Sequence, residues 1–399
     1  MQIVHADRVL PEVAQWADEL AQIRREIHRN PELRFDTEKT VERIVTLLKQ
    51  WGVTKIDVDT VPGGVIAVVE GNRPGVTVAV RADIDALPMN DMSGSAWASC
   101  CDGRAHTCGH DGHQTWLMGT LRHLQADNNF PGRVVGIFQP AEETGEGAAK
   151  IVEAGVLEQY DVKEIYAAHT EPNLNKGTIG FKEGPLQASV DMWWVDIEGV
   201  GTHGGRPHLG IDPIVAGAQI VSAVQTVVSR RVNPIEPAVL SVCSINAGRY
   251  EAGNVVPQRL TMSGTSRLFA PAMRDLVETK FRQLVTTIAE ANDCTATIRY
   301  DRCAPAVNND PALTRALVAI AQEAFGAENI NPAIDAMLSS EDFSHYQQKV
   351  PGVMVRIGVR DENHTLSVHH PGFDFNDEVL PLAVSMFSLI TRRRLEALS

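Results

Sequence analysis

The chain has 399 residues and carries 50 acidic against 36 basic side chains, for a formal net charge of −14. Such an acidic surface repels nucleic acid and anionic membranes, so both are excluded as partners and small-molecule substrates remain. The length exceeds what one compact core usually takes, and we therefore expect two domains.

The first eight residues lack the basic and then apolar run of a signal peptide, and no later apolar stretch is long enough to cross a bilayer. The six cysteines show no spacing typical of a disulfide framework. We therefore expect a cytoplasmic protein. Cys100 and Cys101 could form a metal site of their own, but no histidine or cysteine pair at zinc-finger spacing accompanies them.

The amino-terminal part predicts an α/β sheet. Apolar residues at helical spacing predict helices over residues 11–30 and 41–48, and continuous β-branched runs at 65–69 and 76–80 are typical of strands covered on both faces. The second run leads directly into Asp83 and Asp85, just past the carboxyl end of a buried strand, where open α/β sheets place their active sites. Both aspartates could instead be turn-forming residues.

Residues 105–113 combine one cysteine and three histidines with an aspartate and two glycines. Imidazole and thiolate are ligands that divalent transition metals prefer, and glycine lets the backbone turn closely enough for neighbouring side chains to converge. The alternative is a polar turn whose histidines face water. A helix follows from about Trp116.

Two further strands end in metal-type side chains. The strand 133–138 runs into Glu142 and Glu143, which we expect to point to different sides, so that one binds a metal while the other reaches a water molecule. A solvated acidic loop is the alternative. The strand 165–169 ends at His169.

The pattern of predicted strands and helices changes near residue 188. Strands are predicted at 190–198, 239–245, 260–268 and 294–300, with helices at 213–230 and 271–288. This β-α-β-β-α-β order predicts a ferredoxin-like α+β domain at 188–298, inserted into a discontinuous catalytic domain formed by 1–187 and 299–399. The catalytic domain resumes with a helix at 311–325, a strand at 353–357 and a closing helix at 376–395. We expect it to form a central mixed sheet covered by helices.

The candidate donors at the sheet edge are too many for one closed tetrahedral site and suit two metals that share a water or a thiolate. They are Cys108, His110, Glu142, Glu143, His169 and one of His369 or His370. Such a metal pair suits hydrolysis of an amide, provided that one carboxylate stays off the metals as general base.

Five motifs resemble the M20 metallopeptidase family, in particular its amidohydrolase branch of hippurate hydrolases, N-acyl amino acid aminoacylases and auxin-conjugate hydrolases. They lie at residues 81–88, 108–113, 138–143, 340–343 and 369–371. The resemblance implies that Glu142 is the base and that Asp83 orients a ligand. It also implies five metal ligands: Cys108, His110, Glu143, His169 and His369.

The resemblance further implies that the inserted domain forms a homodimer, or a tetramer built from dimers, and that a histidine on it reaches the partner's active site. His203 is that candidate, and Asn254 and Arg267 are similar to residues that hold the substrate carboxylate. From the residues alone, His203 would be a loop histidine and Arg267 a surface charge.

We therefore expect metal-dependent hydrolysis of N-acyl amino acids, yielding a carboxylic acid and a free amino acid. A dipeptidase or carboxypeptidase on the same scaffold is one alternative, and a metal-binding or ligand-binding protein without turnover is another. The mixed ligand set suits zinc or manganese, with cobalt or nickel also compatible. Residues 93–101 and 168–171 depart from the branch's usual pattern, which weakens transfer of any one relative's substrate.

Overall fold

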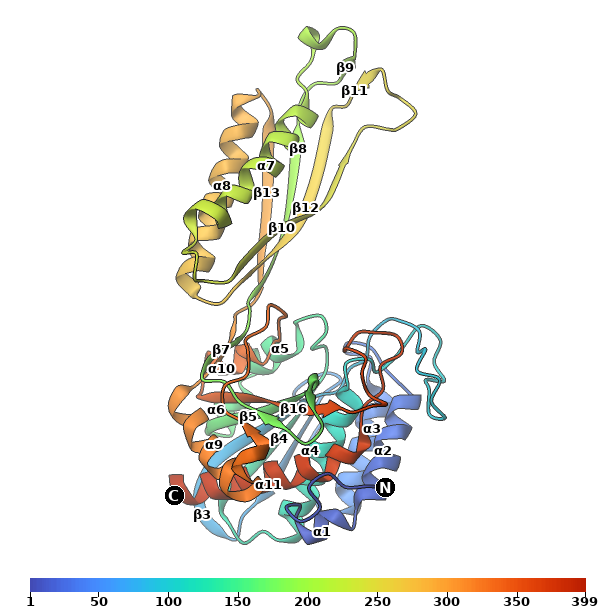
Figure 1. The fold of residues 1–399 in the computed structure, drawn as a ribbon, viewed down its shortest axis with the longest axis vertical. Helices are drawn as coiled ribbons and strands as arrows, with labels where there is room; N and C mark the ends of the chain where they lie inside the picture. The colour runs from blue at the N-terminus through green and yellow to red at the C-terminus, as the bar shows by residue number, and fades with distance from the viewer. The chain divides into compact units, whose positions relative to one another are not determined.

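The computed structural model describes residues 1–399, which form two compact units (Figure 1). The first unit comprises Met1–Leu186, Val307–Ala336 and Asp342–Ser399, and the second comprises Gln187–Ala306 and Met337–Glu341. The second unit extends past the expected boundary at residue 298 because its last strand, β13 (Thr295–Ala304), continues beyond that point.

The first unit is built on an eight-stranded mixed sheet. In sheet order its strands are β1 (Lys55–Asp57), β2 (Val65–Glu70), β4 (Pro131–Gln139), β3 (Arg73–Asp83), β5 (Val162–Asn175), β16 (Gly352–Arg360), β6 (Ile179–Gly180) and β15 (Ile330–Asn331). The central strands β4, β3, β5 and β16 run parallel to one another. Their carboxyl ends therefore meet at one edge of the sheet. A separate two-stranded sheet pairs β7 (Gly184–Gln187) with β14 (Val307–Asn309).

Helices cover both faces of this sheet, as the continuous apolar runs predict. On β3, Val78 and Val80 belong to one buried cluster while Ala79 belongs to another on the opposite face. The helices of the first cluster are α1 (Pro11–Ala14), α2 (Ala17–Arg29), α3 (Glu38–Gln50), α4 (His110–Ala126), α9 (Pro311–Phe325) and α11 (Leu380–Leu398). Those of the second are α5 (Gly147–Glu153), α6 (Val156–Gln159) and α10 (Ser344–Gln347).

Two helices differ from the prediction, one by an interruption and one in where it begins and ends. The helix expected over 11–30 is interrupted at Gln15 and Trp16, where the Trp16 ring packs 4.0 Å from the Arg122 guanidinium. The closing helix begins after a short 3₁₀ turn, η3 (Asp377–Val379), and reaches Leu398. Two other 3₁₀ turns are η1 (Pro207–Leu209) and η2 (Ala327–Asn329).

The second unit confirms the ferredoxin-like order. Its antiparallel sheet has the order β10 (Ala238–Ala247), β12 (Arg259–Leu268), β8 (Val190–Glu198) and β13, and α7 (Pro213–Arg231) and α8 (Pro271–Ala291) pack on one of its faces (Figure 1). Asp212 caps α7 as predicted, accepting the Ile214 N–H at 2.8 Å. A short ribbon pairs β9 (Thr202–His203) with β11 (Val255–Val256).

None of the helices in either unit combines the length and the apolar character that crossing a membrane requires.

Candidate metal centre

Three neighbouring strands bring polar residues to the same level of the sheet. Asp83, the last residue of β3, pairs with Gln139, the last residue of β4. Arg81 pairs with Ala167 of β5, so His169 lies level with Asp83. His169 is not at a strand end, contrary to the prediction, because β5 continues to Asn175.

The segment before α4 adds a cysteine and a histidine to this edge. Gly109 has a left-handed backbone with φ 85°, and a Cβ atom there would lie 2.7 Å from the Thr170 methyl carbon. Only glycine fits this turn without strain. The turn places Cys108 on one side of it and His110, the first residue of α4, on the other.

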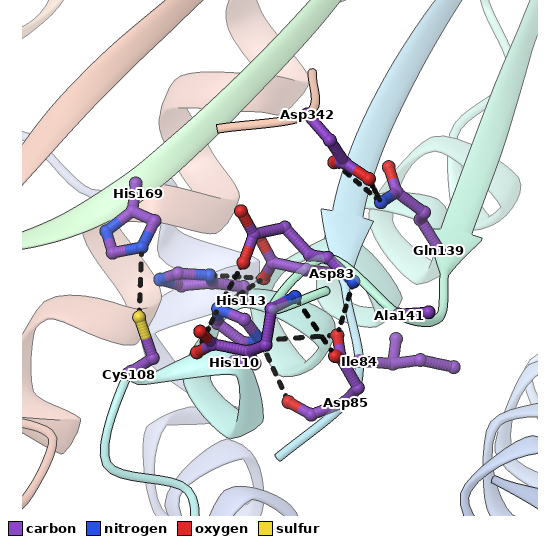
Figure 2. Close-up of polar contacts among 12 residues, drawn as sticks. Asp83, Ile84, Asp85, Cys108, His110, His113, Gln139, Ala141, His169 and Asp342 are labelled. Carbon is purple, nitrogen blue, oxygen red and sulfur yellow. Dashed lines mark hydrogen bonds and ion pairs between the residues drawn. The ribbon is translucent and has the colours of Figure 1, made fainter. Parts of the chain in front are cut away.

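Cys108 is shared by two groups of possible metal ligands. Its Sγ lies 3.4 Å from His169 Nε2 and 3.3 Å from His369 Nε2. The first group is Cys108, His110 and His169, all buried, and the second is Cys108, Glu143 and His369, of which His369 is exposed. Figure 2 shows Cys108 and His169 pointing toward one another, with His110 beside them. Within each group the ligand atoms lie within 4.8 Å of one another.

Backbone carbonyls orient the two buried imidazoles. His110 Nδ1 lies 2.8 Å from the Asp85 carbonyl oxygen, and His169 Nδ1 lies 2.7 Å from the Thr170 carbonyl oxygen. Since a carbonyl oxygen can only accept, each Nδ1 carries a proton, which leaves Nε2 as the nitrogen that can bind a metal.

Among the candidate ligands, two buried atoms have no hydrogen-bond partner: His110 Nε2 and Glu143 Oε1. Buried polar atoms are paired in the great majority of cases, so such atoms call for an explanation. His110 Nε2 lies 3.8 Å from one carboxylate oxygen each of Glu142 and Glu143. A divalent cation among these atoms would satisfy them, and the residues present therefore fit a metal.

The electrostatics of the centre favour a cation. Burial would lower the pKa of His110, but Asp83, Asp85 and Glu143 raise it to about 10. Burial and the charges of Glu143 and Glu142 hold the pKa of the Cys108 thiol well above its usual value. An excess of negative charge thus surrounds both side chains, and a bound cation would favour the thiolate.

His113 belongs to a supporting chain of hydrogen bonds. Its Nε2 accepts the Thr170 N–H at 3.0 Å, so its Nδ1 donates to Asp83 Oδ1 at 2.5 Å. Both ring nitrogens are engaged, so His113 has no nitrogen left to bind a metal. Burial would raise the pKa of Asp83, but His110, His113 and Arg81 hold it well below its usual value.

The sequence did not predict the further polar partners of Asp83, which are Arg81 and, through it, Asp342 and Gln139. Arg81 forms buried ion pairs with Asp83 at 2.6 Å and with Asp342 at 3.0 Å, and its Nε donates to Gln139 Oε1 at 2.8 Å. Figure 2 shows the Asp342 carboxylate directed at the Gln139 amide. The motif at 340–343 contains Asp342, but nothing in the sequence placed its carboxylate beside Arg81 and Gln139.

A second charged cluster lies behind the amino end of α4. His28 Nδ1 lies 2.7 Å from Asp111 Oδ2 and His28 Nε2 lies 3.1 Å from Asp91 Oδ2. Arg24 forms ion pairs with Asp111 at 3.0 Å and with Asp374. Although burial would lower it, hydrogen bonds to the two aspartates raise the pKa of His28 to about 9. The helical pattern of residues 11–30 gave no sign of these charges.

In the second unit, His203 and Asn254 lie together while Arg267 lies on another element. His203 is exposed on β9, its Nδ1 accepts the Gly205 N–H at 2.9 Å, and the Asn254 carbonyl accepts the Gly204 N–H at 2.7 Å. Arg267 is half-buried on β12, and its Nη1 has no hydrogen-bond partner.

Known proteins resemble the whole chain. The model of peptidase family M20/M25/M40 matches residues 79–393. N-acetylcysteine deacetylase of Bacillus subtilis is 38% identical over 92% of this chain and 95% of its own length. IAA-amino acid hydrolase ILR1-like 5 of Arabidopsis thaliana is 35% identical over 96% of this chain and 88% of its own length.

Among solved structures, the Bacillus subtilis YXEP protein, described as a dinuclear metal-binding peptidase of the M20 family, superimposes with a TM-score of 0.84 at 35% identity. The match covers 96% of this chain and 99% of that protein. These matches agree with the fold and with a centre for divalent metal ions. The chain is therefore a metal-dependent amidohydrolase and belongs to peptidase family M20/M25/M40.

Proposed function

We propose that the protein removes the acyl group from N-acyl amino acids, releasing a carboxylic acid and a free amino acid. The observation that carries this proposal is the pair of ligand groups sharing Cys108, with the additional carboxylate of Glu142 beside them, 3.8 Å from His110 Nε2 and in a further group with His110 and Glu143. A purely metal-sequestering protein would have no use for an additional carboxylate at that place. The relatives named for N-acetylcysteine and for IAA-amino acids support an amino acid as the leaving group.

In this proposal, one divalent ion would be held by Cys108, His110 and His169, and a second by Cys108, Glu143 and His369. Such ions supply Lewis acidity and lower the pKa of water. Zinc or manganese suits the mixed donor set, with cobalt or nickel as alternatives. Glu142 would accept the proton of the attacking water at its carboxylate and then donate it to the leaving amine. Asp83 would act indirectly, through His113.

The residues of the second unit would bind the substrate. We propose that His203, reaching the active site of a partner subunit in a homodimer or a tetramer of dimers, donates a hydrogen bond to the developing oxyanion. Asn254 and Arg267 would hold the substrate carboxylate, for which the free Nη1 of Arg267 is suited. A cytoplasmic location remains a prediction from the cysteine usage.

A carboxypeptidase is the second candidate, supported by Thermostable carboxypeptidase 2 of Saccharolobus solfataricus, which is 31% identical over 96% of this chain. Rates of hydrolysis for acetyl, benzoyl and long-chain acyl amino acids should be compared with rates for dipeptides, with each candidate metal added back. Faster turnover of the dipeptides would favour the second candidate.

Glu142→Gln tests the proposed base. It should lower kcat about 10²-fold to 10⁴-fold, the range typical of general acid–base catalysis, while the metal content stays at two ions per chain. Glu146→Gln is the matched control, because Glu146 lies on the same loop and pairs with Arg34 at the surface. Full activity of Glu142→Gln would refute this role, and activity that survives complete removal of metal would refute the proposed function.

A further inference from the structure

Asp85 is a buried carboxylate that the proposed reaction does not use. It lies two residues beyond the end of β3, is fully shielded from solvent, and sits beside the loop that carries Glu142 and Glu143. In Figure 2 it lies beside His110, with dashed lines joining the two residues. Its four polar contacts all lead to Glu142, Glu143 and His110 of the candidate metal centre.

Each oxygen of this carboxylate binds one backbone amide. Oδ1 accepts the Glu142 N–H at 3.0 Å and Oδ2 accepts the Glu143 N–H at 3.2 Å. Since both oxygens face donors, both must be acceptors, which an ionised carboxylate provides and an amide does not. The peptide carbonyl of Asp85 separately accepts the His110 Nδ1 proton.

The backbone that Asp85 holds is an unusual one. Ala141, directly before the two glutamates, has φ 55°, in the left-handed region that residues other than glycine seldom adopt. The loop closes on it, because the N–H groups of Glu146 and Gly147 both donate to the Ala141 carbonyl. Such conformations persist where the surroundings over-determine them, and the two bonds from Asp85 are part of those surroundings.

We propose that Asp85 is a positioning residue, which fixes the backbone from which Glu142 and Glu143 extend, so that one reaches the reacting proton and the other the metal. This inference rests on the proposed function, since it assigns Asp85 a role toward the base and one ligand of that reaction. Its shorter contact with His110 runs through the peptide carbonyl at 2.8 Å, which a side-chain substitution leaves in place, whereas the Asp85 carboxylate lies 3.6 Å from His110 Nδ1. A change of the Asp85 side chain should therefore affect the two ligand groups unequally.

Asp85→Asn tests the proposal, because the amide has the same shape but directs an NH₂ group at one backbone N–H. We expect kcat to fall about 10²-fold, as misplacement of catalytic groups by about 1 Å does, while KM changes less than about threefold. The ion held with Glu143 should bind about 10-fold to 100-fold more weakly. The ion held by Cys108, His110 and His169 should be retained, as judged by metal analysis and by the thiolate absorption of the cobalt-loaded protein.

The matched control is Asp57→Asn. Asp57 also accepts two backbone N–H groups, those of Asp59 and Thr60 at 2.8 and 3.0 Å, but in a turn outside the metal centre. This variant should keep the wild-type kcat and both ions. Equal loss in the two variants would mean that any turn carboxylate matters, and would overturn the proposal.

A measurement on the unaltered protein covers the case in which Asp85→Asn does not fold. Hydrogen exchange of the Glu142 and Glu143 amides should be slowed at least 10²-fold relative to exposed loop amides, and exchange at the unprotected rate would overturn the proposal. If the wild type binds no metal, the proposed function fails. If it binds two ions and Asp85→Asn matches it in kcat and in both affinities, the inference about Asp85 alone fails.

Discussion

The two units differ in how many ionisable side chains they bury. In the second unit, the helices α7 and α8 turn apolar residues such as Val224, Phe281 and Val285 toward the sheet. In the first unit, α4 buries His110, Asp111 and His113 just as completely. Apolar burial stabilises a fold without any ligand, whereas buried ionisable groups need a partner of opposite charge. The second unit is therefore expected to be stable by itself, and the first to depend on cations and on pH.

Removal of metal should give the largest difference in stability between the two units. An ion present at a free concentration a thousand times its dissociation constant stabilises the fold by about 4 kcal/mol. Two such ions are expected in the first unit. Hydrogen exchange resolved along the chain should show faster opening of the first unit after chelation and no change in the second. Equal acceleration in both units would contradict the comparison.

Phe281→Ala should destabilise the second unit rather than the first. Phe281 is fully buried, and its ring centroid lies 4.6 Å from that of Trp193. Truncation of such a side chain costs about 3–5 kcal/mol, here in the unfolding free energy of the second unit. Metal content should remain that of the wild type. Tyr250→Ala, at a residue that is 99% exposed, is the control and should change neither quantity.

The pH dependence of the first unit should reflect His28. Its folded-state pKa of about 9 lies above the value of 6.5 for the unfolded chain, so its contribution is fully present below pH 6.5 and is lost as the pH rises to 9. The difference corresponds to about 3 kcal/mol. Denaturant unfolding of the wild type and of His28→Gln at both pH values measures it. A wild type as insensitive to pH as the variant would refute this assignment.

His203→Ala should have the smallest effect on stability. His203 is exposed, and substitutions at such positions usually change the unfolding free energy by less than about 0.5 kcal/mol. Its proposed contact with the oxyanion nevertheless predicts a large loss of kcat, about 10²-fold to 10³-fold. His208→Ala, at an exposed histidine on the same segment, should retain activity. Equal activities of the two variants would remove His203 from the proposed mechanism.

The sequence alone predicted the layers of the fold because its apolar patterns are strong. Continuous β-branched runs marked β2 and β3, and the Asp212–Pro213 pair marked the start of α7. Element ends were less predictable. The strand β13 continues to Ala304 although its outer part is exposed, because backbone pairing with β8 carries it on.

The types of ligand were predictable, but their neighbours were not. Cysteine, histidine and glutamate near strand ends pointed to a metal centre without any knowledge of distances. That Asp85 would bind the amides of Glu142 and Glu143 depends on a left-handed Ala141, and alanine gives no signal of such a backbone. The pairing of His28 with Asp91 and Asp111 joins segments far apart in the chain, which local patterns do not encode.

The sharing of Cys108 by two ligand groups has a consequence for biosynthesis. Cys108 and His369 lie 261 residues apart, and the whole second unit is synthesised between them. Because domains fold in the order in which they leave the ribosome, the second unit can fold while the first still lacks β16 and the segment carrying His369. The thiol and the first histidines must therefore wait, without their full set of partners, until the segment carrying His369 has been synthesised. On the proposed ligand assignment, the second ion would be captured only after both units have been synthesised around Cys108.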